Sequence, residues 1–242
     1  MTGAEATEPL RAVLLDAFGT LVTMQAPGPH LRRELAERGI EVTEEAAAAA
    51  FSAEIRYYLA HHLEGRDAAS LDDLRDRCAG VLAGALEVEG LAPATARAAM
   101  LASLRFSAYP DAAPALTALR ERGLAIVVAS NWDSSLGEVI ERTGLGSLVD
   151  GVVASADVGV VKPAPELFAA ALELAGVPAS RALHVGDSPA NDVAGAHAAG
   201  LRAVLVVRDD AMSAAVRAHD SAPAGSVSTP TVGDLRELAS VL

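Results

Sequence analysis

Short apolar runs alternate with longer amphipathic stretches along most of this 242-residue chain. The runs are brief, continuous and apolar, which is typical of strands covered on both faces of a parallel sheet. They occupy residues 12–15, 124–129, 151–153, 182–185 and 203–207. Helical spacing of apolar residues follows in 112–122, 134–143, 165–175, 189–199 and 232–242. Strands alternating with such helices predict βαβ units, so we expect an α/β fold with a Rossmann-like, doubly wound parallel sheet as its core.

Residues 24–108 have a different, purely helical pattern. Thr43 followed by Glu45 and an alanine run indicates a helix start, since alanine is the strongest helix former. Pro27-Gly28-Pro29 is expected to be a linker. The helical patterns cover 30–38, 43–62, 70–87 and 94–104. We therefore expect an all-helical domain over 24–108, inserted into a core made of residues 1–23 and 109–242.

Polar residues follow several of the predicted strands. Asp16 and Ser130-Asn131 come directly after apolar runs, Asp187 follows the run 182–185 after Gly186, and Lys162 lies in the loop after 151–153. In an open parallel sheet, ligands bind outside the carboxyl ends of the strands. The sequence therefore predicts that these side chains converge on one site.

Two turns beside these residues indicate helix starts. Ser188-Pro189 is typical of an N-cap followed by proline in the first helical position. Asp133 is expected to cap the helix after Ser130. The backbone N–H groups near Asn131 would then face an anion held at that helix start.

Composition narrows the classes of partner. The formal net charge of −13 disfavours binding to nucleic acid or to an anionic membrane surface. A small anionic substrate remains compatible, because local backbone dipoles can outweigh a distant net charge. The single cysteine, Cys78, excludes a disulfide within the chain and a cysteine-rich metal site. No apolar run is long enough to span a bilayer and no secretion signal is visible, so we expect a cytoplasmic protein.

Four short motifs resemble those of the haloacid-dehalogenase-like superfamily, and they occur in the family's order. They are Asp16-Ala17-Phe18-Gly19-Thr20-Leu21, Ser130-Asn131, Lys162-Pro163, and Gly186-Asp187-Ser188 with Asn191-Asp192. The helical insert lies between the first and second motifs, where that family carries a helical cap. The resemblance covers residues 11–210 and implies a hydrolase that uses an aspartyl intermediate.

The resemblance also implies a role for each group. Asp16 would attack the substrate and carry it as a covalent ester, because an ionised carboxylate needs no activating base. Ser130 and Asn131 would hold the transferring group. Lys162 would pair with Asp16 and neutralise charge in the transition state.

A Mg²⁺ site is implied by the same motifs. Asp16, Asp187 and the backbone carbonyl of Phe18 would supply its oxygen ligands. Asp192 would stand behind them as a supporting residue, and Thr20 would orient the loop that carries Asp16.

One position departs from the phosphatase pattern. Phe18 stands where phosphatases of this family have a second aspartate, which protonates the leaving group and then activates water. Such acid–base help is typically worth 10²–10⁴-fold. The form with Phe18 looks like the 2-haloacid dehalogenases. Those enzymes use no Mg²⁺, and their fourth motif lacks the Gly-Asp found here at Gly186-Asp187. They also supply an arginine from the cap, for which Arg56 is a candidate here.

Three interpretations follow. We favour a Mg²⁺-dependent phosphatase of a small phosphorylated metabolite, because Asp187 and Asp192 are retained. The alternatives are a metal-independent 2-haloacid dehalogenase and a non-enzymatic binding protein with the same fold. The sequence leaves the natural substrate open, and it allows a monomer or a homodimer.

Overall fold

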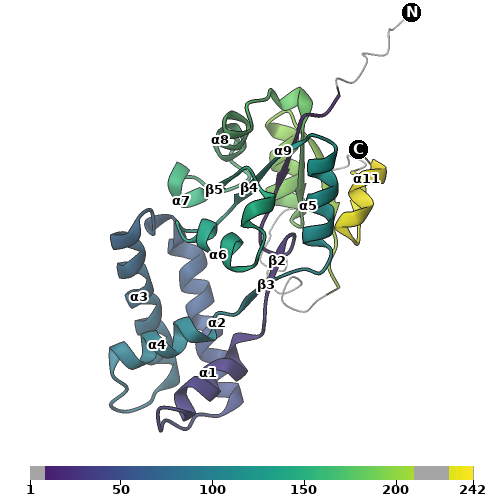
Figure 1. Ribbon diagram of the computed structural model, residues 1–242. Helices are drawn as coiled ribbons and strands as arrows, with labels where there is room; N and C mark the ends of the chain where they lie inside the picture. Colours follow the sequence, from purple (N-terminus) through teal and green to yellow (C-terminus); the bar gives the residue numbers. More distant parts are fainter. Residues whose placement is uncertain (1–8, 210–228, 242) are drawn as a thin grey trace, which may run out of the picture. The chain divides into compact units, whose positions relative to one another are not determined.

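The computed structural model describes residues 9–209 and 229–241. Their contacts divide them into two units (Figure 1). The α/β unit takes the described residues of Met1–Thr23, Ala108–Asn131 and Ser135–Leu242. The helical unit takes Met24–Ser107 together with Trp132–Ser134. Each unit has an apolar core of its own.

The α/β unit is built on a parallel sheet that, among the described residues, has six strands in the order β5-β4-β1-β6-β7-β8. The chain winds outward from β1 to β5 and then returns to the other side of β1, which is the doubly wound order of a Rossmann-like fold. The expected fold class is therefore confirmed. The strands are β1 (Ala12–Leu15), β4 (Ala125–Ser130), β5 (Gly151–Ala154), β6 (Ala182–Gly186), β7 (Arg202–Val206) and β8 (Thr231–Val232).

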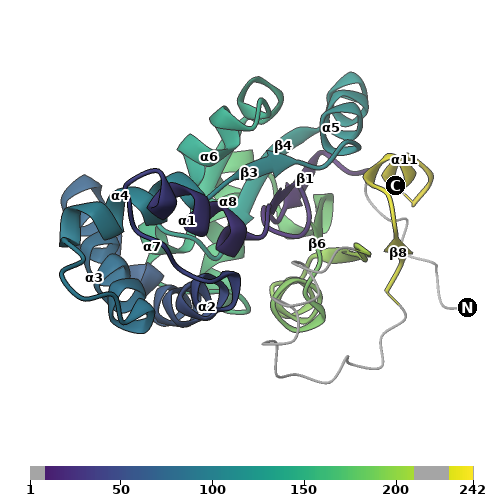
Figure 2. The same ribbon diagram turned by 90° about the horizontal axis from the view of Figure 1, so that it is seen from below.

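Helices cover both faces of this sheet. Helices α5 (Ala112–Glu121) and α6 (Leu136–Arg142) lie on one face, and α8 (Pro165–Ala175) and α9 (Gly195–Ala198) lie on the other (Figures 1 and 2). The α8 face is packed by Phe168 against alternate strand residues such as Leu14 and Val127. The remaining segments are α7 (Ser155–Val158), η2 (Gly146–Leu148), η3 (Ala179–Arg181), η4 (Pro189–Ala194), η5 (Leu235–Glu237) and α11 (Leu238–Val241).

The helical unit encloses a separate core. The Thr43 side chain accepts a hydrogen bond from the backbone N–H of Ala46 at 3.1 Å, which confirms the predicted helix start. The buried side chains of Phe51, Leu82 and Met100 meet inside the unit. Its helices are α1 (Pro27–Ala36), α2 (Glu44–His61), η1 (His62–Glu64), α3 (Ala68–Leu86) and α4 (Pro93–Ser103).

Strands β2 (Val22–Met24) and β3 (Phe106–Ala108) form a two-stranded sheet. This sheet was not predicted from the sequence, because strands of three residues give too short a pattern.

Two predicted elements are wrong. Pro27-Gly28-Pro29 is not a linker but the first turn of α1, where proline lacks only an N–H that the helix does not use. Val232 does not begin a helix: it ends β8 and pairs with Val206 in the sheet. The helical pattern holds only from η5 onward, and residue 242 lies outside the described part of the chain.

Within residues 9–209 and 229–241, no helix combines the length and the hydropathy needed to cross a bilayer.

The core of the helical unit contains one carboxyl group that should make stability depend on pH. Glu54 lies on α2 and is only 5% exposed. Burial raises its pKa from 4.5 to about 7, although a hydrogen bond with the Cys78 thiol opposes the rise. Between these two values the folded chain holds a proton that the unfolded chain has lost, so stability falls as pH rises through this window.

We predict that Glu54→Gln removes this dependence, because glutamine keeps the shape and cannot ionise. The wild type should lose stability relative to Glu54→Gln from pH 5 to pH 8, by up to about 3 kcal/mol. Thermal unfolding of both proteins across this range measures the difference. Glu89→Gln, at an exposed loop position, is the matched control. A difference between wild type and Glu54→Gln that does not change with pH would contradict the prediction.

Candidate functional site

The carboxyl ends of three neighbouring strands bring the predicted polar residues together. Strand β1 lies between β4 and β6, and Leu15 is in register with Val128 and Val185. Asp16 therefore emerges between the ends of the two flanking strands, and its N–H donates to the Val185 carbonyl at 2.9 Å. Ser130 ends β4 and reaches Asp16 directly: its hydroxyl donates to Asp16 Oδ1 at 2.9 Å. This edge is the point where the winding of the sheet reverses.

A buried lysine connects two of the carboxylates. Lys162 Nζ lies 2.5 Å from Asp16 Oδ1 and 2.6 Å from Asp192 Oδ1, and the residue is 3% exposed. Burial alone would lower the pKa of Lys162, but the charges of Asp16 and Asp192 outweigh burial and raise it. The group is therefore a permanent cation held between two carboxylates.

Asp192 is fixed from several directions. Its Oδ1 also lies 2.8 Å from His184 Nε2, and its Oδ2 accepts from the Ser188 N–H at 2.9 Å. Burial would raise the pKa of Asp192, but the Lys162 charge and the hydrogen bonds outweigh it and hold the pKa well below its usual value. A Cβ atom at Gly186 would overlap the Asp192 carboxylate, so this close approach requires glycine there.

Asp16 has a less stabilised charge. Burial raises its pKa, the charge of Lys162 lowers it, and the nearby Asp192 charge raises it again. The net effect is a raised pKa of Asp16. Its carboxylate is poorly solvated, and further positive charge nearby would stabilise its ionised form.

Asp187 completes a cluster that suits a metal ion. Carboxylate oxygens of Asp16, Asp187 and Asp192 lie within 4.8 Å of one another, and all three residues are buried. Carboxylate oxygens are the ligands that hard divalent cations prefer. The residues present therefore fit a divalent metal site.

The turn after Asp16 runs close to this cluster. Gly19 has a φ of +79°, and a Cβ atom there would overlap the Asp187 carboxylate. Both the backbone conformation and the space require glycine. The backbone of this turn therefore lies close to the Asp187 carboxylate.

Asn131 and Thr20 make contacts that the sequence did not predict. The Asn131 side chain accepts from the Lys162 N–H at 2.7 Å and donates to the Lys162 carbonyl at 3.3 Å. It therefore fixes the loop that carries Lys162. The Thr20 hydroxyl is fully buried and finds no hydrogen-bond partner within the described residues. The Thr20 carbonyl instead accepts from Arg208 Nη2 at 2.7 Å.

The predicted helix cap at Asp133 is wrong. Helix α6 begins at Leu136, after Ser135, so its free N–H groups do not adjoin Asn131. Residues Trp132–Ser134 group with the helical unit, where the Ser134 N–H donates to the Gly65 carbonyl at 2.8 Å. Residues 132–134 therefore lie outside the helix that Asp133 was expected to cap.

Other residues of interest lie on the helical unit, in the turn after Asp16 and within β6. Arg56 is exposed on α2, and Phe18 is half-buried and forms a bridge with Val22. His184 lies within β6, and its bond to Asp192 is visible only in the tertiary structure. One sequence signal went unused: Lys162 is the only lysine in the chain, all the other basic side chains apart from histidine being arginines.

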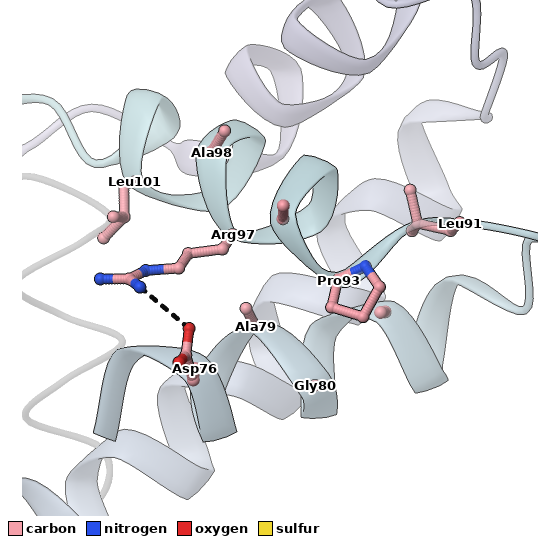
Figure 3. A pocket seen from close by; sticks show the side chains of 10 residues that line it. Asp76, Ala79, Gly80, Leu91, Pro93, Arg97, Ala98 and Leu101 are labelled. Carbon is pink, nitrogen blue, oxygen red and sulfur yellow. Dashed lines mark ion pairs between the residues drawn. The ribbon is translucent and has the colours of Figure 1, made fainter. Parts of the chain in front are cut away.

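A hollow in the helical unit is unrelated to these residues. It has a volume of about 650 Å³ and lies between α3 and α4 (Figure 3). Small apolar side chains line it, and Arg97 pairs with Asp76 at 3.0 Å across it. None of the predicted catalytic or metal-binding residues lines this hollow.

Part of the chain is similar in sequence to proteins that are named as phosphatases. The chain is 38% identical to a phosphoserine phosphatase of Thermus thermophilus over 64% of its own length and 60% of that protein. It is 35% identical to a ribulose-1,5-bisphosphate 5-phosphatase of Halopiger xanaduensis over 64% of its own length and 70% of that protein. The matched region therefore spans less than two thirds of the first relative.

Solved structures extend the likeness to almost the whole chain. The L-2-haloacid dehalogenase of Xanthobacter autotrophicus superposes with a TM-score of 0.68 at 25% identity, covering 96% of this chain and 98% of that one. The family model for haloacid dehalogenase-like hydrolases matches residues 10–200. The chain therefore belongs to the haloacid dehalogenase-like hydrolase family.

Proposed function

We propose that this protein is a Mg²⁺-dependent phosphatase that acts on a small phosphorylated metabolite through a covalent intermediate on Asp16. The observation that carries the proposal is the buried carboxylate cluster: oxygens of Asp16, Asp187 and Asp192 lie within 4.8 Å of one another, as ligands of one divalent cation would. A dehalogenase that uses no metal has no need of this third carboxylate. The two relatives named as phosphatases support the same reaction class.

Asp16 is the nucleophile in this proposal. Ser130 and Lys162 both donate to its Oδ1, which orients the carboxylate relative to the end of β1. The carboxylate is poorly solvated, which favours attack on phosphorus. Lys162 also offsets negative charge that develops when the phosphoryl group transfers.

The metal would be held by Asp16, Asp187 and the carbonyl of Phe18. When bound, Mg²⁺ would supply positive charge to the phosphoryl oxygens. Asp192 has an indirect role, because it holds Lys162 and is itself held by His184 and Ser188. Ser130 would also bind the phosphoryl group, and Asn131 would act through the Lys162 loop.

Phe18 limits which esters are cleaved well. No carboxyl group stands at this position to protonate the leaving oxygen, so a phosphate ester should react fastest when its alcohol leaves readily as an anion. The helical unit is proposed to act as a cap that excludes water from the reaction. We also infer a cytoplasmic location and a monomeric or homodimeric state, as expected from the sequence.

A 2-haloacid dehalogenase is the second candidate. Phe18 favours it, because a halide leaves without a proton, and so does the likeness to the Xanthobacter autotrophicus enzyme over nearly the whole chain. The buried Asp187 weighs against it. A non-enzymatic binding protein is the third candidate.

The first test is hydrolysis of p-nitrophenyl phosphate as Mg²⁺ is titrated. We predict turnover that requires Mg²⁺ and falls by at least about 10³-fold in Asp16→Asn, because the amide is not a nucleophile. Asp73→Asn, at an exposed site on α3, is the control and should keep full activity.

Failure would take one of two forms. Chloride release from 2-chloropropionate without phosphatase activity would replace the proposal with the dehalogenase. Absence of both activities, with beryllofluoride binding that depends on Asp16, would point to the binding protein.

The second test restores the missing carboxyl group. We predict that Phe18→Asp raises kcat/KM for an alkyl phosphate by about 10²-fold, because a general acid helps most when the leaving group is poor. The gain for p-nitrophenyl phosphate should be much smaller. Phe18→Leu controls for loss of the ring and should leave the ratio of the two substrates unchanged. Equal gains on both substrates would contradict this account of Phe18.

A further inference from the structure

A second buried ion pair lies in the α/β unit and has no part in the proposed chemistry. Arg208 follows β7 and Asp111 precedes α5; they are 8% and 5% exposed. Arg208 Nη1 donates to Asp111 Oδ2 at 2.7 Å, and the guanidinium lies 4.0 Å from the centre of the Tyr109 ring. An unpaired charge at this depth would be strongly destabilising, so the two residues depend on each other.

This pair joins separate segments of the chain. Arg208 Nη2 donates to the Thr20 carbonyl at 2.7 Å, in the turn that follows the nucleophile. Arg208 Nη1 also reaches the Gly233 carbonyl at 3.4 Å. The Leu235 N–H donates to Asp111 Oδ2 at 2.7 Å. One guanidinium therefore fastens the turn after Asp16 to the end of β7 and to the C-terminal segment.

The turn itself is held together by bonds to one carbonyl. The N–H groups of Thr20, Leu21 and Val22 all point to the Ala17 carbonyl, at 3.3, 2.8 and 2.9 Å. These bonds keep the shape of the turn, but they do not set its position relative to the sheet. Contacts from outside do so: Arg208 holds the Thr20 carbonyl, and the Tyr109 N–H holds the Leu21 carbonyl at 3.0 Å.

The position of the turn matters for the metal cluster. Gly19 lies so close to Asp187 that even a Cβ atom would overlap the carboxylate. The same turn begins at Asp16 and contains the Phe18 carbonyl. A small shift of the turn would therefore change the spacing of all three groups that would hold the cation.

We propose that Arg208 is a positioning residue: acting through the Thr20 carbonyl, it holds the turn that follows the nucleophile in the place that the cation site requires. It touches no reacting atom. The sequence predicted that Thr20 orients the loop that carries Asp16, and in this inference the Thr20 carbonyl does so through Arg208. The catalytic part of this inference rests on the proposed function, whereas the placement of the turn does not.

Arginine is suited to this task because its planar fork serves two acceptors in fixed directions. Arg208→Lys keeps the positive charge near Asp111 but offers one ammonium group, which cannot reproduce both Nη contacts. The substitution therefore separates charge from positioning. Arg236→Lys is the matched control, because Arg236 makes a comparable fork to Asp234 in an exposed pair.

The decisive experiment measures amide hydrogen exchange by NMR. In Arg208→Lys we expect exchange at Leu21 and Val22 to quicken by about tenfold or more, while Leu14 in β1 stays unchanged. Arg236→Lys should leave all three amides as in the wild type. If exchange at the turn is unchanged in folded Arg208→Lys, or if it quickens equally in β1, the inference is overturned.

A second measurement follows the cation site without relying on turnover. Because Lys162 is the only lysine, ¹³C-lysine labelling gives one side-chain resonance beside the cluster, and Mg²⁺ can be titrated against it. We expect the half-saturating Mg²⁺ concentration to rise by about tenfold in Arg208→Lys. In turnover assays kcat should fall at saturating substrate with little change in KM for the substrate.

The controls separate the two proposals. A wild type that binds no Mg²⁺ and releases no phosphate would sink the proposed function, while the exchange data would still decide the role of Arg208. If Arg208→Lys does not fold, Asp111→Asn takes its place, because it keeps an acceptor for Leu235 and weakens the hold on Arg208. It should show the same local quickening of exchange, and its absence would overturn the inference.

Discussion

The buried ammonium group of Lys162 is the interaction on which the site depends. Asp16 and Asp192 could not both stay ionised at this depth without a cation between them. The surrounding residues serve this contact: Asn131 fixes the backbone of Lys162, and the missing side chain at Gly186 lets Asp192 approach. The chain's single lysine lies at the centre of the site, where its compact ammonium group contacts both carboxylates.

The sheet supplies the other constraint. Because β1 lies in the middle and the winding reverses beside it, the residues after β1, β4 and β6 must meet at one edge. This is why short apolar runs, each followed by a polar residue, were enough to predict that Asp16, Ser130 and Asp187 lie near one another. A strand that is buried on both faces of a sheet has a continuous apolar sequence, so it can be predicted from that sequence alone.

Features that depend on distant partners were not visible in the same way. The edge strand at Val232 looked helical, because its pairing with β7 is tertiary. Asp133 resembled a helix cap, because no local sequence pattern shows that Trp132–Ser134 group with the helical unit. Thr20 was predicted to orient the loop that carries Asp16, but the sequence could not show that its carbonyl accepts from Arg208, which is far away in sequence. Every residue has a backbone carbonyl, so the residue type does not show which carbonyl accepts a hydrogen bond from a distant side chain.

The absence of a carboxyl group at Phe18 gives the most direct test of the covalent mechanism. A good leaving group speeds formation of the phosphoryl-enzyme, but its hydrolysis lacks a general base and should be slow. Rapid mixing with p-nitrophenyl phosphate and Mg²⁺ should therefore give a burst of nitrophenol equal to the enzyme concentration, with a phosphoryl group on the peptide that contains Asp16. Steady release from the first turnover, with no adduct on Asp16 in quenched samples, would contradict the account.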